Sequence, residues 1–157
     1  MLFRSQIDKA IADYTKASEL DPKNANVHNT VAWALATDPN PNARDPGRAV
    51  NCAKKAVELA PNDGNFWNTL GVAHYRAGDW KAAIEALEKS MKLRNGGDRS
   101  DWFFLAMSHE KLGEKEKARQ WYDRATHWMG KNSGSDQEIG RFRSEAAELL
   151  GVDNEED

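Results

Sequence analysis

Small residues recur along this chain at a nearly fixed step, within segments whose apolar residues have helical spacing. The first member of each pair is an alanine, at Ala10, Ala49, Ala83 and Ala118. The second member lies seven positions later, at Ala17, Ala56, Ser90 and Ala125. Successive alanines of the first set are 39, 34 and 35 residues apart. A period of about 34 residues in a helical sequence predicts stacked helical hairpins rather than a globular enzyme.

The clearest unit is the segment 64–97. Apolar and small residues follow one another at three- and four-residue steps over 67–75, which predicts a helix. Gly78-Asp79 then provides a helix end and the start of a second helix over 80–93. Two helices joined by so short a turn are expected to lie antiparallel, as a hairpin.

This unit resembles the tetratricopeptide repeat, in the style of bacterial arrays of such repeats. The residues that carry the resemblance are Trp67, Leu70, Gly71, Tyr75, Ala83, Leu87 and Ser90. Two positions depart from the family pattern: His74 stands at the usual tyrosine and Asn95 at the closing proline. The resemblance implies an all-α fold, a right-handed α-solenoid of antiparallel helical hairpins.

The repeats predict the organisation of the whole chain. We expect one tetratricopeptide-repeat domain over residues 1–151, followed by an acidic tail at 152–157. Its expected parts are a leading half-repeat at 5–22, repeats at 25–61, 64–97 and 99–130, and a capping helix at 136–150. A proline-rich loop inserted at 38–45 explains the long first step. The helix over 136–150 is expected to shield the end of the stack, because a terminal repeat cannot bury its own face.

Charge and composition exclude several classes of function. The 157 residues carry 22 Lys and Arg against 25 Asp and Glu, and no basic stripe that would indicate nucleic-acid binding. The apolar runs are too short to cross a bilayer, and the first residues lack the apolar segment of a signal peptide. A single cysteine, Cys52, excludes an internal disulfide. We therefore expect a cytoplasmic protein that binds neither membrane nor nucleic acid.

The sequence contains no recognisable catalytic or cofactor motif. No phosphate-binding loop or nucleophile elbow is present, so we expect a non-enzymatic protein without a cofactor. His74 and His109 occupy equivalent places in successive repeats, where two imidazoles could share a metal. No nearby cysteine or acidic pair completes such a site, which favours packed histidines and no metal.

The resemblance places a ligand groove on the first helices of successive repeats. Its expected residues are Asn29, Trp33, Thr37, Asn65, Asn68, Val72, Tyr75, Arg76, Ser100, Phe103, Met107, Glu110 and Lys111. Aromatic and methionine side chains beside amides are typical of surfaces that recognise peptides. The first hypothesis is therefore a scaffold or regulatory module that binds a peptide or protein segment in this groove.

One known use of such repeats is excluded by the resemblance itself. Chaperone-tail adaptors hold a C-terminal carboxylate with a clamp of lysine, arginine and asparagine on three first helices. The matching positions here are Asn29, Trp33, Thr69, Ser100 and Phe104, and none is a cation. A carboxylate would lack its charge-assisted partners there, so we do not expect a chaperone-tail adaptor.

The second hypothesis is a structural element that self-associates. The leading half-repeat matches only the second helix of a unit. Its apolar face, with Ile7, Ile11 and Tyr14, would then lack a partner helix and would favour a homodimer.

Overall fold

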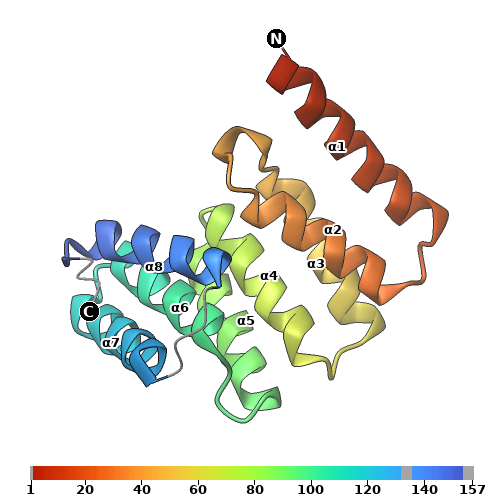
Figure 1. Cartoon of the computed structure of the whole chain (residues 1–157). Helices are drawn as coiled ribbons and strands as arrows, with labels where there is room; N and C mark the ends of the chain where they lie inside the picture. Colours follow the sequence, from red (N-terminus) through yellow and green to blue (C-terminus); the bar gives the residue numbers. More distant parts are fainter. Residues whose placement is uncertain (1, 132–135, 154–157) are drawn as a thin grey trace.

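The computed structural model describes residues 2–131 and 136–153, with all of their side chains except those of residues 2–5, 7, 130 and 131. Within this part of the chain there are α-helices, one short 3-10 helix and no strand. The elements are α1 (Leu2–Leu20), α2 (Ala25–Thr37), η1 (Pro41–Ala43), α3 (Pro46–Leu59), α4 (Gly64–Arg76), α5 (Trp80–Leu93), α6 (Arg99–Lys111), α7 (Lys115–Lys131) and α8 (Gln137–Leu150). The predicted all-α fold is confirmed (Figure 1).

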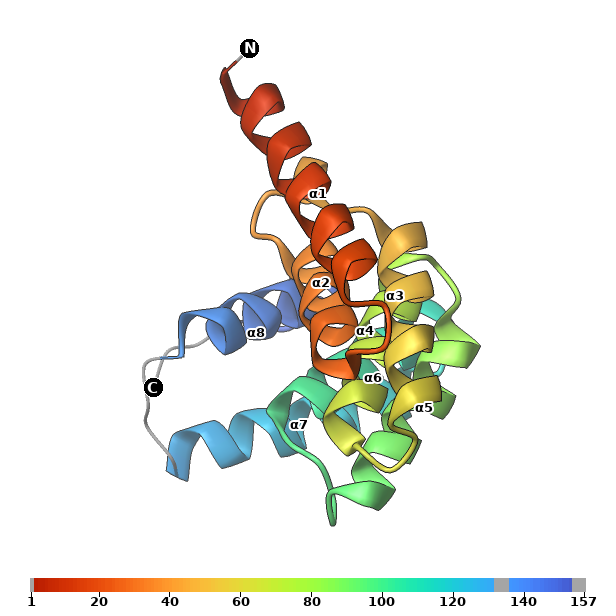
Figure 2. The ribbon, with the colours of Figure 1, turned by 90° about the vertical axis from the view of Figure 1, so that its right-hand side faces the viewer.

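Three helical hairpins, α2–α3, α4–α5 and α6–α7, stack into a solenoid. The first helices form the inner layer, in which α2 contacts α4 and α4 contacts α6, and each also packs on the second helix of its own hairpin. Figure 2 shows the inner helices between α8 on one side and α3 and α5 on the other. The buried apolar residues form one continuous cluster from Val31 to Ala147.

A glycine lets the two helices of the middle hairpin approach closely. A Cβ atom on Gly71 of α4 would lie 2.5 Å from Cγ of Leu87 and 3.2 Å from the backbone oxygen of Ala83, both on α5. A larger residue at position 71 would push α5 away. The turn that follows is closed by Gly78, whose φ of 81° is the left-handed conformation that glycine adopts most easily.

Acidic and amide side chains begin the helices of the stack. Asp45, Asp63, Asp79, Asp98 and Asp136 are the N-caps of α3, α4, α5, α6 and α8, and each accepts a hydrogen bond from a backbone N–H of the first turn. Pro46 follows Asp45 at the first position of α3. The preceding loop, in which the insertion was predicted, contains η1.

The helix α1 has fewer neighbours than the others. It packs on α2 and touches η1. Ile11 and Tyr14 are half-buried against the core, and Leu20 is 75% exposed. Ile7, which was expected to belong to the same apolar face, has a side chain outside the described residues. In Figure 1, α1 extends away from the stack at the N-terminal end.

The helix α8 contacts both helices of the last hairpin and also extends over the earlier ones. It lies across the inner layer and contacts α6 as well as α7. Its side chains also reach Trp33 on α2 and Arg76 on α4. The apolar face of the helix expected over 136–150 is buried, and it lies on the concave side of the stack.

Candidate functional site

The concave face, formed by α2, α4 and α6, holds α8 through aromatic contacts. Phe142 of α8 is 2% exposed and lies between two rings of the inner layer. Its centroid is 4.8 Å from that of Phe104 and 6.1 Å from that of Trp33, both in edge-to-face geometry. Tyr75 extends the cluster by packing on Phe104, with centroids 5.4 Å apart. Edge-to-face pairs of this kind are each worth about 0.5–1.5 kcal/mol beyond burial of their area.

A buried arginine provides the polar part of the same contact. The side chain of Arg76 is 8% exposed, and its two terminal nitrogens pair with the two carboxylate oxygens of Glu145 on α8. Its Nε donates to the backbone oxygen of Ala36 on α2 at 3.0 Å, and its guanidinium lies 5.3 Å from the Phe104 centroid. A bidentate arginine–carboxylate pair is directional, so this contact fixes the register of α8 on the face.

Part of the concave face remains open beside the N-terminal end of α8. A cavity of about 380 Å³ lies there, lined by residues of α2, α4, α6, α7 and α8. Five predicted groove residues line this open cavity: Asn29, Trp33, Asn65, Asn68 and Ser100. Trp33 takes part in both regions: it lines the cavity and packs on Phe142, and it donates from Nε1 to Glu138 at 3.3 Å.

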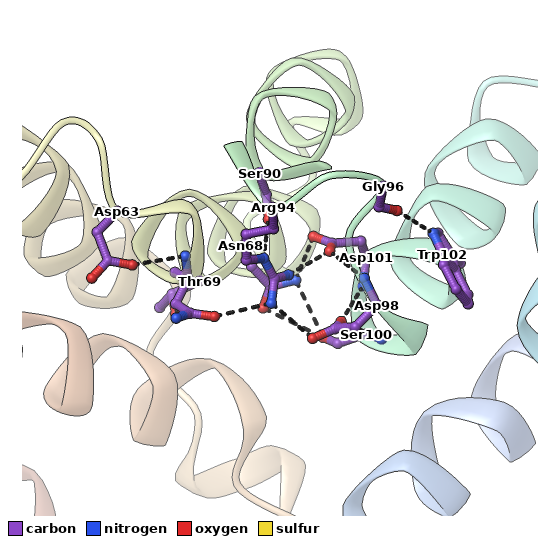
Figure 3. A network of polar contacts seen from close by, with 11 residues as sticks. Asp63, Asn68, Thr69, Ser90, Arg94, Gly96, Asp98, Ser100, Asp101 and Trp102 are labelled. Atoms are coloured by element: carbon purple, nitrogen blue, oxygen red, sulfur yellow. Dashed lines mark hydrogen bonds and ion pairs between the residues drawn. The ribbon is translucent and has the colours of Figure 1, made fainter. Parts of the chain in front are cut away.

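A polar network joins α4 to α6 at one wall of the open cavity (Figure 3). Asp101 is fully buried and accepts from Nδ2 of Asn68 at 2.8 Å and from the guanidinium of Arg94. Arg94 also bonds Asp98 at 2.8 Å and Asn65 at 2.9 Å. Burial raises the pKa of Asp101, while the bond from Asn68 and the charge of Arg94 act against that rise.

A second pocket of about 400 Å³ lies beside Glu145 and is rich in cations. It is lined by Arg44, Arg76 and Lys111, with Tyr75, Trp80 and Glu145 among its other walls. Arg44 donates from Nε to the backbone oxygen of Asp38 at 2.8 Å, and the Lys111 ammonium lies 5.8 Å from the Trp80 centroid. We call this the cationic pocket.

The structure separates the predicted groove residues into four groups. Asn29, Trp33, Asn65, Tyr75, Arg76 and Lys111 line the open cavity or the cationic pocket. Asn68 and Ser100 also line the cavity but are buried in the α4–α6 junction. Glu110 is half-buried and lines neither.

Four other predicted residues are enclosed, and their placement on an open groove was wrong. Thr37, Val72, Phe103 and Met107 are all buried. Thr37 donates its hydroxyl to the backbone oxygen of Trp33 at 2.7 Å, and Phe103 turns towards α7, where its centroid is 6.0 Å from that of Tyr122. The prediction assumed an uncovered face, whereas the inner helices contact one another and α8 covers part of the layer.

Three residues of the contact between α8 and the inner layer were not predicted as groove residues. Phe142 and Glu145 were not assigned to the groove, and Phe104 was named only as a position that matches the carboxylate clamp. The signal was the amphipathic pattern of α8, in which Ile139, Phe142 and Ala146 share one face. That pattern shows that the helix buries a face but not which surface receives it.

His74, His109 and Cys52 occupy packed positions, and His127 is exposed. His109 is buried, and its Nδ1 lies 2.6 Å from Oε2 of Glu114. Burial lowers the pKa of His74 and raises the pKa of the Cys52 thiol. Among the described residues no group of three or more His, Cys, Asp and Glu side chains is arranged to hold a metal ion. No helix within the described ranges combines the length and apolar character needed to cross a bilayer.

Comparison with known proteins accounts for this architecture. One tetratricopeptide-repeat family profile matches residues 42–98, and a second matches residues 5–24 and 102–128. Superkiller protein 3 of Schizosaccharomyces pombe (strain 972 / ATCC 24843) is 30% identical over 99 residues, which are 61% of this chain but 7% of that protein. The chain therefore spans only a small part of this curated relative.

Solved structures of MamA share the fold. The crystal structure of MamA protein aligns with a TM-score of 0.63 and 23% identity, over 95% of this chain and 81% of that one. The structure titled MamA MSR-1 C2 aligns with a TM-score of 0.65 and 20% identity, over 84% and 72% of the two chains. The profile matches, which together cover most of the chain, show that it belongs to the tetratricopeptide-repeat family, whose repeats form surfaces for protein–protein interaction.

Proposed function

We propose that this protein binds a segment of a partner protein on its concave face, in a scaffold or regulatory role. The observation that supports the proposal is the seating of α8, a helix of the same chain that packs on this face through aromatic and charged contacts. Residues flanking that seat, Asn29 and Asn65 among them, offer amide groups in the open cavity. Aromatic anchors with adaptable polar groups around them are typical of interaction surfaces.

A site-specific crosslink tests this proposal. A photoreactive amino acid replaces Asn65, which is exposed at the open cavity, in the full chain. The matched control carries the same group at Glu88, which is exposed on α5 in the outer layer. After irradiation in extract of the native cell, we expect a discrete protein adduct from position 65 and not from position 88. Equal labelling at both positions, or none at 65, would contradict binding on this face.

Self-association through α1 is the second candidate function. The observation in its favour is that none of the described side chains of α1 is fully buried. The test is the molar mass of the protein by light scattering as its concentration is raised. A dimer that is lost in Ile11→Asp supports this function, and a monomer at every concentration argues against it.

A further inference from the structure

The side of α8 that packs on the concave face indicates which kind of helix this face can bind. Ile139, Phe142 and Ala146 are buried and recur at three- and four-residue steps along α8. Glu145 stands beside them and pairs with Arg76. An apolar stripe with one carboxylate at its edge is therefore the complement of the concave face.

The α8 helix leaves the charge of the cationic pocket incompletely neutralised. Arg76 pairs with Glu145, but neither Arg44 nor Lys111 has an ion pair with any described residue. Burial and the neighbouring Arg76 lower the pKa of Arg44, and Asp38 and Glu145 act against this.

One residue of α8 itself adds to this positive charge. The charge of Arg141 acts on Arg44 in the same direction as that of Arg76, and lowers its pKa. The partner of Arg141 is Glu138, with 3.7 Å between Nη2 and Oε2, and both side chains are partly exposed. Position 141 is four residues, about one helical turn, before Glu145, so the two lie on the same side of α8. A carboxylate at position 141 would replace a repulsion with an attraction.

We propose that the concave face binds an acidic amphipathic helix of a partner protein in place of α8. This inference rests on the proposed function. The partner helix presents an aromatic residue at the place of Phe142 and a carboxylate at the place of Glu145. A second carboxylate one turn earlier, at the place of Arg141, faces Arg44. The helix α8 is then the internal competitor that keeps the face covered until such a partner arrives.

Competition with a tethered helix explains why the additional carboxylate matters. A segment in the same chain competes at an effective concentration of the order of millimolar, which reduces the apparent affinity of any partner. A partner displaces α8 only by binding the face more tightly than α8 does. An acidic helix would gain this additional affinity from its attraction to the cationic pocket.

The experiment uses synthetic helices made from the chain's own sequence. A fluorescent peptide of residues 136–150 is titrated with two full-length proteins, the unaltered chain and Phe142→Ala, in which α8 loses its central anchor. We expect the peptide to bind Phe142→Ala at least tenfold more tightly than the unaltered chain, measured by fluorescence anisotropy. Equal binding to the two proteins would show that α8 and the peptide do not compete, and would overturn the inference.

Peptide variants test the charges without altering the fold of the protein. Relative to the unaltered peptide, Glu145→Gln is expected to bind Phe142→Ala about tenfold more weakly, and Arg141→Glu several-fold more tightly. Glu148→Gln is the matched control, because Glu148 is exposed on the same helix, and its affinity should not change. Equal affinity of all four peptides for Phe142→Ala would show that carboxylates do not contribute to binding, and would contradict the inference.

Two further measurements distinguish a misfolded variant from a wrong inference, and a wrong inference from a wrong proposed function. Ala146→Asp provides a second way to release α8 if Phe142→Ala fails to fold by circular dichroism, and it must give the same order of affinities. Failure of the peptide to bind both folded release variants contradicts the inference. A partner that crosslinks at position 65 through a segment without an acidic helix would also overturn it, while the proposed function would stand.

Discussion

Arg76 on α4 and Glu145 on α8 form a bidentate ion pair, with Nη2 of the arginine 2.9 Å from Oε2 of the glutamate. The same guanidinium bonds the backbone of α2 through Nε. One side chain therefore connects an inner helix of the first complete hairpin, an inner helix of the second, and the helix that covers both.

Removing the carboxylate should loosen α8 more than it loosens the stack. In Glu145→Gln the bond with Arg76 loses its charge on one side, and we expect a cost of about 1–2 kcal/mol to the docking of α8. Hydrogen exchange measured by mass spectrometry should show faster exchange in α8 and unchanged exchange in α4. Glu148→Gln is the control, and a similar acceleration there would contradict a specific role for the pair.

Two glycines should respond to alanine in opposite directions. At Gly71 the added methyl would meet Leu87 at 2.5 Å, so Gly71→Ala is expected to destabilise the protein by about 1–3 kcal/mol. At Gly140, inside α8, the methyl would meet nothing within 4 Å. Gly140→Ala should therefore stabilise by about 0.5–1 kcal/mol, through its higher helix propensity. Urea unfolding followed by circular dichroism measures both changes, and the same sign for the two would be inconsistent with this packing.

The junction between α4 and α6 should depend on Asp101. Asp101→Ala leaves Arg94 without its most buried partner and Asn68 without its closest acceptor. Because the Arg94 side chain is 21% exposed, water compensates part of the loss, and we expect a cost of about 2–3 kcal/mol. Asp123→Ala, which breaks an exposed pair with Arg119 at 2.8 Å, should cost below about 1 kcal/mol. Equal costs in thermal unfolding would show that burial of the network adds nothing.

His74 should make stability fall on mild acidification. Burial lowers the pKa of His74 in the folded protein below the 6.5 of an ordinary histidine, so the unfolded chain binds a proton first as the pH falls. The stability contributed by neutral His74 is complete above the unfolded pKa and is lost as the pH drops below it. In His74→Tyr, which restores the residue usual for the repeat, the free energy of unfolding should change less between pH about 7.5 and about 5.5. An identical change in both proteins over this interval would contradict the prediction, and their pH dependence should coincide above pH about 7.5.

The repeat pattern was sufficient to predict the hairpins, because each is specified locally. Gly71 and Ala83 mark the close approach within one hairpin, and Asp79 marks the start of its second helix, all within a short stretch of sequence. The position of α8 could not be predicted in this way. Its apolar face fits either the end of the stack or the concave layer, and the choice depends on Trp33, Phe104 and Arg76, which lie far from it in the sequence.

A shift of one residue along α6 explains why Phe103 was wrongly assigned to the open groove. Neighbouring positions on a helix point about 100° apart. Phe103 and Phe104 therefore face different helices, Tyr122 on α7 and Phe142 on α8 respectively. The repeat pattern predicted the helix α6 correctly. The choice of Phe103 rather than Phe104 came from the resemblance to repeats whose concave side is open.

The bond between Trp33 and Glu138 joins positions 105 residues apart. In a simple array of repeats each unit contacts only its neighbours, and the units can unfold from the ends one after another. Here α8, the last helix, also contacts α2 of the first complete hairpin. Unfolding of the terminal hairpins is thereby coupled, and the chain must close a long loop to complete its fold. We expect it to melt more cooperatively, and to complete folding more slowly, than an array of the same length with an empty concave side.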